Sequence, residues 1–277
     1  MNNRFFVLCM FGLLLLPTVY ASDFAYIVKS SLGIDNYLIN EINNNGYTVD
    51  IVFSGNISEY DLSSYRMLII GDQNLDNIDL IPIDQYRSLI INSFNYFKKS
   101  PTDFQLGISS VAGSLTSPSI LVLVDNGSPI VEGVSQRFNA YTLSDPNVKT
   151  AYLKGQKPAG INFIISTESL DSDSVIATIN PGTSYLNGRV ANERNLFFGI
   201  TKSQYWTRNS SLLFSNSLKW VLEGEDRDED GFNSDFDCND TDPNVNPDSQ
   251  EVPYDGIDND CNQGADCLDP DCAGQAG

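Results

Sequence analysis

The chain of 277 residues contains no histidine, and its 16 lysine and arginine residues stand against 36 aspartate and glutamate residues. Without an imidazole it cannot form a Ser-His-Asp or Cys-His catalytic pair, a histidine-ligated zinc or copper site, or a histidine general base. The formal net charge of −20 disfavours binding to nucleic acid or to an anionic membrane surface, because clustered lysine and arginine are needed to bind phosphate groups. The same charge favours cations as ligands.

Long hydrophobic runs are also scarce, and the one extended apolar stretch, Phe5–Leu16, lies near the start of the chain. It follows Arg4 and precedes Val19 and Ala21, which occupy the −3 and −1 positions of a cleavage site, as in an export signal. Its length of about twelve residues is short of the roughly 20 that a membrane-spanning helix needs. We therefore expect residues 1–21 to be a signal peptide that is removed after Ala21. An uncleaved N-terminal anchor is the alternative.

Cysteine is rare and unevenly placed: of five cysteines, Cys9 lies in the expected signal peptide and the other four follow residue 237. No other stretch is apolar and long enough to span a bilayer, so we expect the mature protein to be secreted or displayed at the cell surface. Cysteines pair in that oxidising environment, and four of them allow three pairings. We favour Cys238–Cys261 and Cys267–Cys272, because the second pair lies within one short acidic loop. A metal–thiolate site is the alternative, less expected outside the cell and without histidine.

Most of the negative charge lies at the end of the chain. Residues 225–277 contain 17 acidic residues and one basic residue, Arg227, whereas residues 1–224 are nearly balanced. Such a step in charge indicates a domain boundary. We therefore predict two parts after the signal peptide, residues 22–224 and residues 225–277. A disordered acidic tail is the alternative for the second part.

Hydrophobic patterning in residues 22–224 predicts an α/β domain. Apolar runs indicate buried strands, and apolar residues at helical spacing indicate helices. The expected strands are Phe24–Val28, Thr48–Phe53, Tyr65–Ile70, Ser119–Asp125, Ala140–Leu143, Ala151–Leu153, Asn162–Ser166, Val175–Ile179 and Leu196–Ile200, and the expected helices are Gly33–Asn45, Ile83–Lys99 and Ser211–Leu222. Strands and helices in this order suggest a flavodoxin-like, open, mostly parallel sheet with helices on both faces.

Several segments of this domain resemble the class I glutamine amidotransferase-like superfamily, including its ThuA-like members. They are the opening strand, the strand that ends in Gly71-Asp72, the segment Ser128–Gly133, and the strand Leu196–Ile200 with its following helix, which carries Trp220. The resemblance implies the fold of residues 22–224. Catalytic members of the superfamily pair a cysteine nucleophile with a histidine, and this domain has neither, so we expect a non-catalytic binding or scaffold domain.

Three carboxylates of this domain, Asp72, Asp125 and Glu168, are candidates for strand-end positions. Open α/β sheets bind ligands at the carboxyl ends of their strands. Solvated carboxylates or helix caps at those positions are the ordinary interpretation. Carboxylates can also act as general acids and bases, so the alternative function is a carboxylate-dependent hydrolase or carbohydrate-processing enzyme of this fold.

The strongest motif lies in the acidic part, where a twelve-residue stretch has the spacing of an EF-hand-type calcium loop. Calcium is held by hard oxygen ligands, and alternate residues of a tight loop point toward the ion. Gly231 stands where the loop turns sharply. The predicted ligands are the side chains of Asp226, Asp228, Asp230 and Asp237 and the backbone carbonyl of Phe232.

A second twelve-residue stretch follows in the same register, and more acidic residues come after it. Val245 replaces the loop glycine here, so the backbone must differ from that of an EF-hand. The predicted ligands of this stretch are Asp240, Asp242, Asn244, Asn246 and Glu251, and further candidates are Asp255, Asp258 and Asp260.

The run from Asp226 to Cys261 contains Asp-Cys-Asn-Asp-Thr-Asp-Pro from Asp237 and Asp-Gly-Ile-Asp-Asn-Asp-Cys from Asp255. It resembles the metal-binding repeat of MopE-type bacterial and archaeal surface proteins. It is also similar to the aspartate-rich repeats of thrombospondin type 3. The resemblance implies a small cation-filled module attached to a larger extracellular domain. Because this segment lacks histidine and tryptophan, we expect two or more calcium ions rather than copper.

The acidic part has too few large apolar side chains to fold on a hydrophobic core alone. Disulfides and bound cations are therefore expected to stabilise it, which makes metal binding part of folding. The expected partners are divalent cations, with surface glycans or other extracellular proteins as candidates for the α/β domain.

Overall fold

The computed structural model describes residues 22–92, 110–116, 119–145, 147–154, 159–168, 170–185, 188–224, 228, 230, 232, 237–262 and 264–266. The predicted signal peptide, Asp226 and the Cys267–Cys272 pair lie outside these residues. So does the second half of the predicted helix Ile83–Lys99. No helix of the described part is long and apolar enough to cross a membrane.

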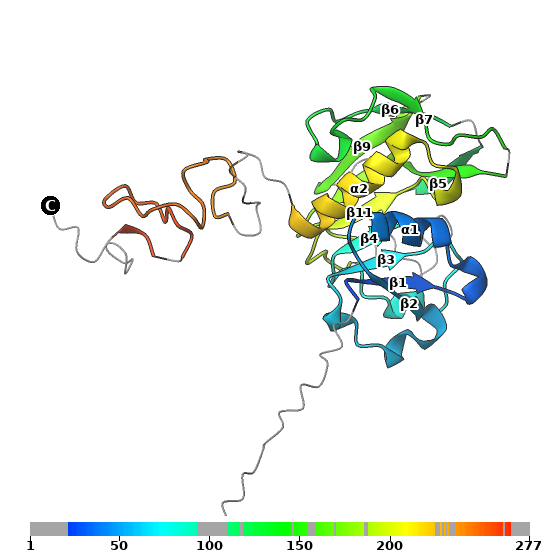
Figure 1. The fold of residues 1–277 in the computed structure, drawn as a ribbon, viewed down its shortest axis with the longest axis horizontal. Helices are drawn as coiled ribbons and strands as arrows, with labels where there is room; N and C mark the ends of the chain where they lie inside the picture. The colour runs from blue at the N-terminus through cyan, green and yellow to red at the C-terminus, as the bar shows by residue number, and fades with distance from the viewer. Residues whose placement is uncertain are drawn as a thin grey trace, which may run out of the picture.

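Five parallel strands form one half of the sheet (Figure 1). In spatial order they are β2 (Val49–Phe53), β1 (Phe24–Val28), β3 (Met67–Ile70), β4 (Ser88–Ile90) and β11 (Asn195–Phe198). Every neighbouring pair in this half is parallel. The order matches that of a flavodoxin-like sheet, so the predicted open parallel sheet is confirmed here.

The other half of the sheet is antiparallel, which makes the whole sheet mixed. It begins at β10 (Leu170–Ile179), which pairs antiparallel with β11. The remaining strands are β9 (Ile161–Thr167), β6 (Ile120–Leu123) and β7 (Arg137–Asn139), together with β8 (Lys149–Lys154) and β5 (Ser110–Thr116), which branch from β10. The sequence indicated that this region is rich in strands, although β5 was not predicted.

Both faces of the sheet are covered. Successive residues of β1 alternate between two apolar cores, because side chains alternate across a strand. The helices α1 (Asn36–Asn44) and α2 (Arg208–Glu223) contribute to the core that contains Phe24. The opposite core is covered by loops and 3-10 helices. The 3-10 helices of the domain are η1 (Ser31–Gly33), η2 (Ser54–Glu59), η3 (Leu62–Ser64), η4 (Ile78–Leu80), η5 (Pro129–Val131) and η6 (Ser203–Tyr205).

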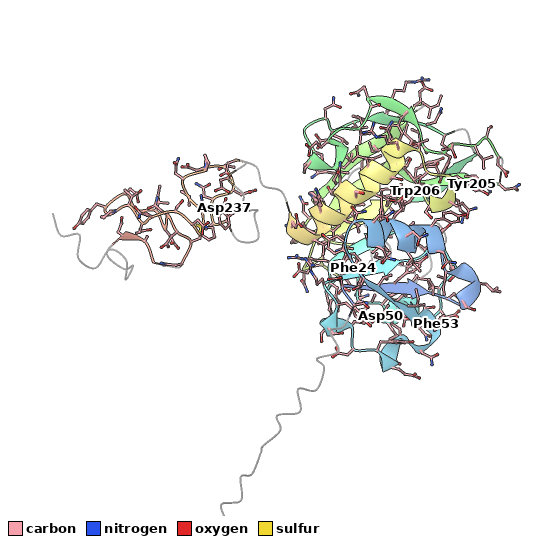
Figure 2. All side chains as sticks on the ribbon, viewed as in Figure 1. Phe24, Asp50, Phe53, Tyr205, Trp206 and Asp237 are labelled. Atoms are coloured by element: carbon pink, nitrogen blue, oxygen red, sulfur yellow. A yellow bond between two sulfur atoms is a disulfide. The ribbon has the colours of Figure 1, made fainter. Side chains whose placement is uncertain are left out.

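The edge strand β2 differs from its central neighbour β1. All five residues of β1 are buried, whereas Asp50 and Phe53 of β2 are exposed. Figure 2 labels both residues, and also Phe24 of β1. An edge strand is covered on one side only, which explains the polar residue within it.

Two element predictions are wrong in the described residues. The predicted helix Ile83–Lys99 contains strand β4, whose residues Leu89 and Ile90 belong to opposite cores, a period of two that was mistaken for a helical period. The second wrong prediction is the strand Ala140–Leu143. The observed strand, β7, ends one residue before that range, and within the range Tyr141 forms an isolated bridge to Trp206.

Candidate functional site

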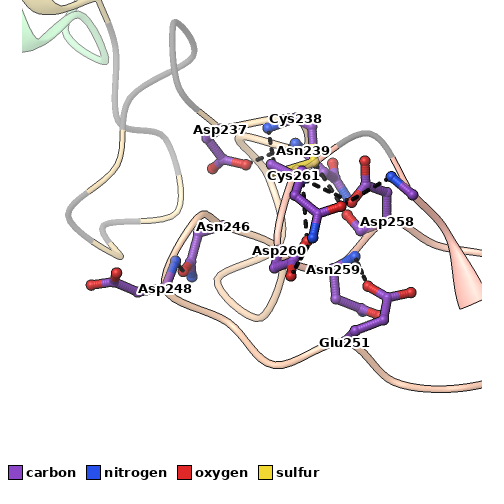
Figure 3. The surroundings of a disulfide bond; sticks show 12 residues. Asp237, Cys238, Asn239, Asn246, Asp248, Glu251, Asp258, Asn259, Asp260 and Cys261 are labelled. Atoms are coloured by element: carbon purple, nitrogen blue, oxygen red, sulfur yellow. Dashed lines mark hydrogen bonds between the residues drawn. A yellow bond between two sulfur atoms is a disulfide. The ribbon is translucent and has the colours of Figure 1, made fainter. Parts of the chain in front are cut away.

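The acidic module is held together by a disulfide between Cys238 and Cys261, with Cα atoms 5.6 Å apart (Figure 3). This is the pairing that the sequence favoured. Apolar packing contributes little: Val245 is buried, but Val252 and Tyr254 are exposed. Folding of this segment therefore depends mainly on the disulfide, on hydrogen bonds and on the balance of its charges.

The first carboxylate group consists of Asp228, Asp230 and Asp237, each of which places a carboxylate oxygen within 4.8 Å of those of the other two. These residues occupy positions 3, 5 and 12 of the first predicted loop. One oxygen of Asp230 accepts a hydrogen bond from the Phe232 amide at 2.8 Å, and its other oxygen, Oδ2, is buried without a hydrogen-bond partner among the described residues. Three anionic side chains packed this closely repel one another, and a cation between them would offset that repulsion.

The second carboxylate group consists of Glu251, Asp258 and Asp260, again with oxygens within 4.8 Å of one another. The Glu251 side chain is buried, and its two oxygens accept hydrogen bonds from the backbone amides of Asn259 at 2.8 Å and Asp266 at 2.6 Å. These amides orient Glu251 toward the two aspartates. The group can supply carboxylate oxygens to a second cation.

The side chains of three remaining predicted ligands close local turns by accepting hydrogen bonds from backbone amides two residues further along the chain. Asp242 Oδ1 accepts a hydrogen bond from the Asn244 amide at 3.2 Å, Asn246 Oδ1 from the Asp248 amide at 3.0 Å, and Asp255 Oδ1 from the Ile257 amide at 2.9 Å. Asp240, Asp242 and Asp255 belong to neither carboxylate group of the described residues. The structure therefore places Glu251 with the later aspartates instead of with the start of the second predicted loop.

Two residues explain this rearrangement. Val245, which replaces the loop glycine, is buried at 1% exposure, so the chain packs there instead of turning around an ion. Asn259, which was not among the predicted ligands, is also buried. Its Oδ1 accepts a hydrogen bond from the Val252 amide, and its carbonyl accepts one from the Asn246 amide, both at 2.9 Å. Its position between two predicted ligands was the only sequence signal for this role.

The donor set suits a hard cation. Carboxylate oxygens are the ligands that calcium, magnesium and manganese prefer, whereas copper prefers imidazole and sulfur ligands. The chain has no histidine, its three methionines lie at positions 1, 10 and 67, and the sulfurs of Cys238 and Cys261 are joined to each other. The oxygen donors of the described module are therefore of the kind that hard divalent cations prefer.

A cleft of about 570 Å³ lies at the carboxyl edge of the parallel strands, in the α/β domain. Open α/β sheets bind ligands at this edge. Its lining comes from the ends of β1, β3, β4 and β11 and from the start of α1: Tyr26, Lys29, Leu32, Gly33, Ile34, Asp35, Asn36, Tyr37, Leu38, Asp72, Gln73, Asn74, Ile91, Thr201, Lys202 and Gln204. The edge is therefore hollow and is lined by both polar and apolar groups.

The charged side chains of the cleft are held by neighbours. Asp72 forms a 2.8 Å ion pair with Lys202. Asp35 caps α1 by accepting hydrogen bonds from the backbone amides of Tyr37 and Leu38, and it also accepts a 2.7 Å hydrogen bond from Ser203 Oγ. Burial raises the pKa of Tyr26, with the charges of Asp35 and Asp72 adding to the effect. Its hydroxyl therefore stays neutral and accepts a hydrogen bond from the Asp35 amide.

The other two strand-end carboxylates lie outside the cleft lining. Asp125 Oδ1 accepts a 3.0 Å hydrogen bond from the Gly127 amide, which closes a turn. Glu168 forms a 2.6 Å ion pair with Arg137. Both residues therefore agree with the ordinary interpretation given above, which is a solvated or capping carboxylate at a strand end.

A family model matches part of the acidic module. The family model for the copper-binding MopE type, described as a "Putative metal-binding motif", matches residues 237–267. None of the curated proteins matches the chain. The MopE-type resemblance of the acidic module is thereby confirmed.

Similar solved structures cover the α/β domain. They include a "Putative thua-like protein" from Bacteroides uniformis (12% identity, 73% of this chain and 91% of that chain, TM-score 0.49). A cytoplasmic protein from Salmonella typhimurium LT2 is 13% identical over 72% of this chain and 99% of that chain, with a TM-score of 0.49. A glutamine amidotransferase from Thermotoga maritima is 10% identical over 72% of this chain and 97% of that chain, with a TM-score of 0.41.

Proposed function

We propose that the chain is an exported calcium-binding protein of the cell surface or the extracellular space. The grouping of Asp228, Asp230 and Asp237 carries this proposal, because residues at EF-hand spacing meet at one point. The family match at residues 237–267 supports metal binding, and the all-oxygen donors favour calcium. Export rests on the N-terminal pattern, and N-terminal sequencing of the exported protein should find Ser22 first.

In this proposal each carboxylate group holds one calcium ion. Asp228, Asp230 and Asp237 bind the first, and Glu251, Asp258 and Asp260 bind the second. Side-chain carboxylates alone leave room for backbone carbonyls and waters, since calcium takes six to eight oxygen ligands. The ions neutralise carboxylates that would otherwise repel one another, and so stabilise the module.

The metal content of single variants distinguishes two ligand sets for the second ion, the second carboxylate group and the second loop predicted from spacing. We expect the purified chain to contain two calcium ions, and Asp228→Ala and Asp260→Ala each to lose one, because each removes a carboxylate from one group. Asp242→Ala is expected to keep both ions, since Asp242 belongs to neither group. Mass-spectrometric metal analysis after dialysis measures this.

Asp248→Ala is the matched control, because Asp248 is exposed and also lies outside both groups. If Asp242→Ala loses an ion while Asp260→Ala does not, the second site lies in the loop predicted from spacing and the grouping proposed here is wrong. Copper in place of calcium in the unaltered chain would contradict the metal assignment.

For the α/β domain we propose a binding role at the cleft. Lys29 and Lys202 are each paired with an aspartate at 2.8 Å, so the cleft has little positive charge to attract an anion. Its amide and carboxylate groups suit a neutral, hydroxyl-rich ligand, and the exposed side chains of Leu32 and Tyr37 offer apolar surface at the rim. A surface glycan has this chemistry.

An enzyme remains the second candidate function, because the cleft contains two carboxylates, Asp35 and Asp72. Both carboxylates already have structural partners, which favours binding over catalysis. Asp35→Asn separates the two functions, since asparagine also caps a helix but cannot act as a base. Hydrolysis of a bound glycan by the unaltered chain and not by this variant would establish the enzyme.

Tyr37→Ala tests the cleft directly. We expect it to weaken binding of a cognate sugar by roughly tenfold, because an aromatic face in contact with a ligand contributes on the order of 1 kcal/mol. Calorimetric titration with mono- and oligosaccharides measures the change. Tyr254→Ala is the control, since Tyr254 is also exposed but lies in the acidic module. Equal affinity in the two variants would exclude this rim from the binding site.

A further inference from the structure

Each cysteine of the disulfide directly follows a member of one carboxylate group. Asp237 of the first group directly precedes Cys238, and Asp260 of the second group directly precedes Cys261. A carboxylate oxygen of Asp237 and the two sulfurs lie within 4.8 Å of one another. Figure 3 shows both aspartates beside the disulfide. The bond is therefore the covalent connection between the two groups, across a sequence separation of 23 residues.

Hydrogen bonds also hold the loop of the second group. The Asn246 amide donates to the Asn259 carbonyl at 2.9 Å, and the Val252 amide donates to Asn259 Oδ1 at 2.9 Å. Val245 is the buried large apolar residue of the described module. A single hydrogen bond stabilises a fold only modestly, because it replaces hydrogen bonds to water in the unfolded chain. Once the disulfide is opened, repulsion between carboxylates acts against few attractive contacts.

We infer that the Cys238–Cys261 disulfide couples the two carboxylate groups into one cation-binding unit, so that calcium is bound tightly only while the disulfide is intact. This inference rests on the proposed function and adds a dependence on the redox state of the surroundings. The closed disulfide restricts the loop that contains Glu251, Asp258 and Asp260, and it fixes Asp237 beside that loop in the calcium-free chain. Both effects lower the conformational cost of binding. The module would thus bind calcium after export and not before.

The coupling must act in both directions. A dithiol such as dithiothreitol reduces the disulfide by exchange. Its thiolate attacks one cysteine sulfur and releases the other, and its second thiol then attacks the mixed disulfide and releases the first. Two cysteine thiols form, and the reagent leaves as a cyclic disulfide. If an intact disulfide strengthens calcium binding, bound calcium must disfavour reduction by the same factor.

Calorimetric calcium titration of the full chain tests the inference. We expect Cys238→Ser/Cys261→Ser to bind calcium more weakly by on the order of tenfold or more, as the entropy lost with a disulfide of this loop length implies. The control is Cys267→Ser/Cys272→Ser, which leaves the coupling bond in place and should keep the affinity of the unaltered chain. Equal affinity in both double variants would overturn the inference while leaving the proposed function intact.

A second measurement needs no substitution. The equilibrium between oxidised and reduced Cys238–Cys261 in a dithiothreitol buffer, followed by thiol alkylation and mass spectrometry, should shift toward the disulfide by at least about tenfold on addition of saturating calcium. An unchanged equilibrium in a chain that binds calcium would refute the coupling. Failure of the oxidised, unaltered chain to bind any calcium would instead refute the proposed function, and the inference with it.

Discussion

Removal of calcium with a chelator is expected to unfold the acidic module and to leave the α/β domain folded. Each site adds about 2.7 kcal/mol to stability when free calcium is 100 times the dissociation constant, so two sites together add about 5 kcal/mol. The module has little apolar burial to replace this contribution, and its carboxylates repel one another once the cations leave. The α/β domain has its own two apolar cores and does not depend on the metal.

Limited proteolysis with a glutamate-specific protease detects this unfolding. Glu251 is only 7% exposed, so cleavage after it should be slow in calcium and fast after chelation. The chain's two tryptophans, Trp206 and Trp220, both lie in the α/β domain, and their fluorescence should not change. Potassium chloride at matched ionic strength is the control. Equal protection of Glu251 with and without calcium would show that the module folds without the metal.

Phe214→Ala is expected to destabilise the α/β domain by about 3–5 kcal/mol, the usual cost of replacing a buried phenylalanine by alanine. Phe214 lies on α2, is fully buried, and its ring centroid is 5.8 Å from that of Phe198 in β11 and 5.1 Å from that of Trp206. Trp206 is held in place by a 2.8 Å hydrogen bond from its indole nitrogen to the Ile200 carbonyl. The neighbouring rings therefore cannot easily collapse into the space left by Phe214.

Denaturant unfolding followed by tryptophan fluorescence measures this loss. Lys219→Ala is the matched control on the same helix, since Lys219 is exposed and should change the unfolding free energy by less than about 0.5 kcal/mol. The same loss in both variants would mean that α2 is not packed through Phe214. Calcium binding should remain in Phe214→Ala wherever the module is folded, because the two carboxylate groups lie outside this core.

Much of the parallel half of the sheet could be predicted from the sequence. The runs at β1 and β3 are apolar at every position, and β11 is apolar after Asn195, as expected of strands buried on both faces. The strand β4 was missed because three residues are too few to establish a period, and the apolar residues around it also fit a helix. The pairing of β8 with both β10 and β5 could not be predicted, because it depends on contacts between distant segments.

The first carboxylate group and the Cys238–Cys261 pair could also be predicted from the sequence. In a tight loop the spacing of residues along the chain decides which side chains face the same point, so Asp228, Asp230 and Asp237 could be chosen from their spacing. The second loop had similar spacing but lacked the glycine. Its grouping was decided by the burial of Val245 and by the backbone amide of Asn259, neither of which a ligand pattern contains.

By itself the sequence determined the charge of the acidic module, its oxygen-rich donor set, the absence of histidine chemistry and the apolar strands of the domain before it. Only the tertiary structure decided that Glu251 meets Asp258 and Asp260, and that Asp35, Asp72 and Lys202 line one cleft. The physical reason is distance along the chain. Local spacing restricts neighbours within a turn, whereas residues far apart in sequence are brought together by strand order, by a covalent bridge and by what the core can bury.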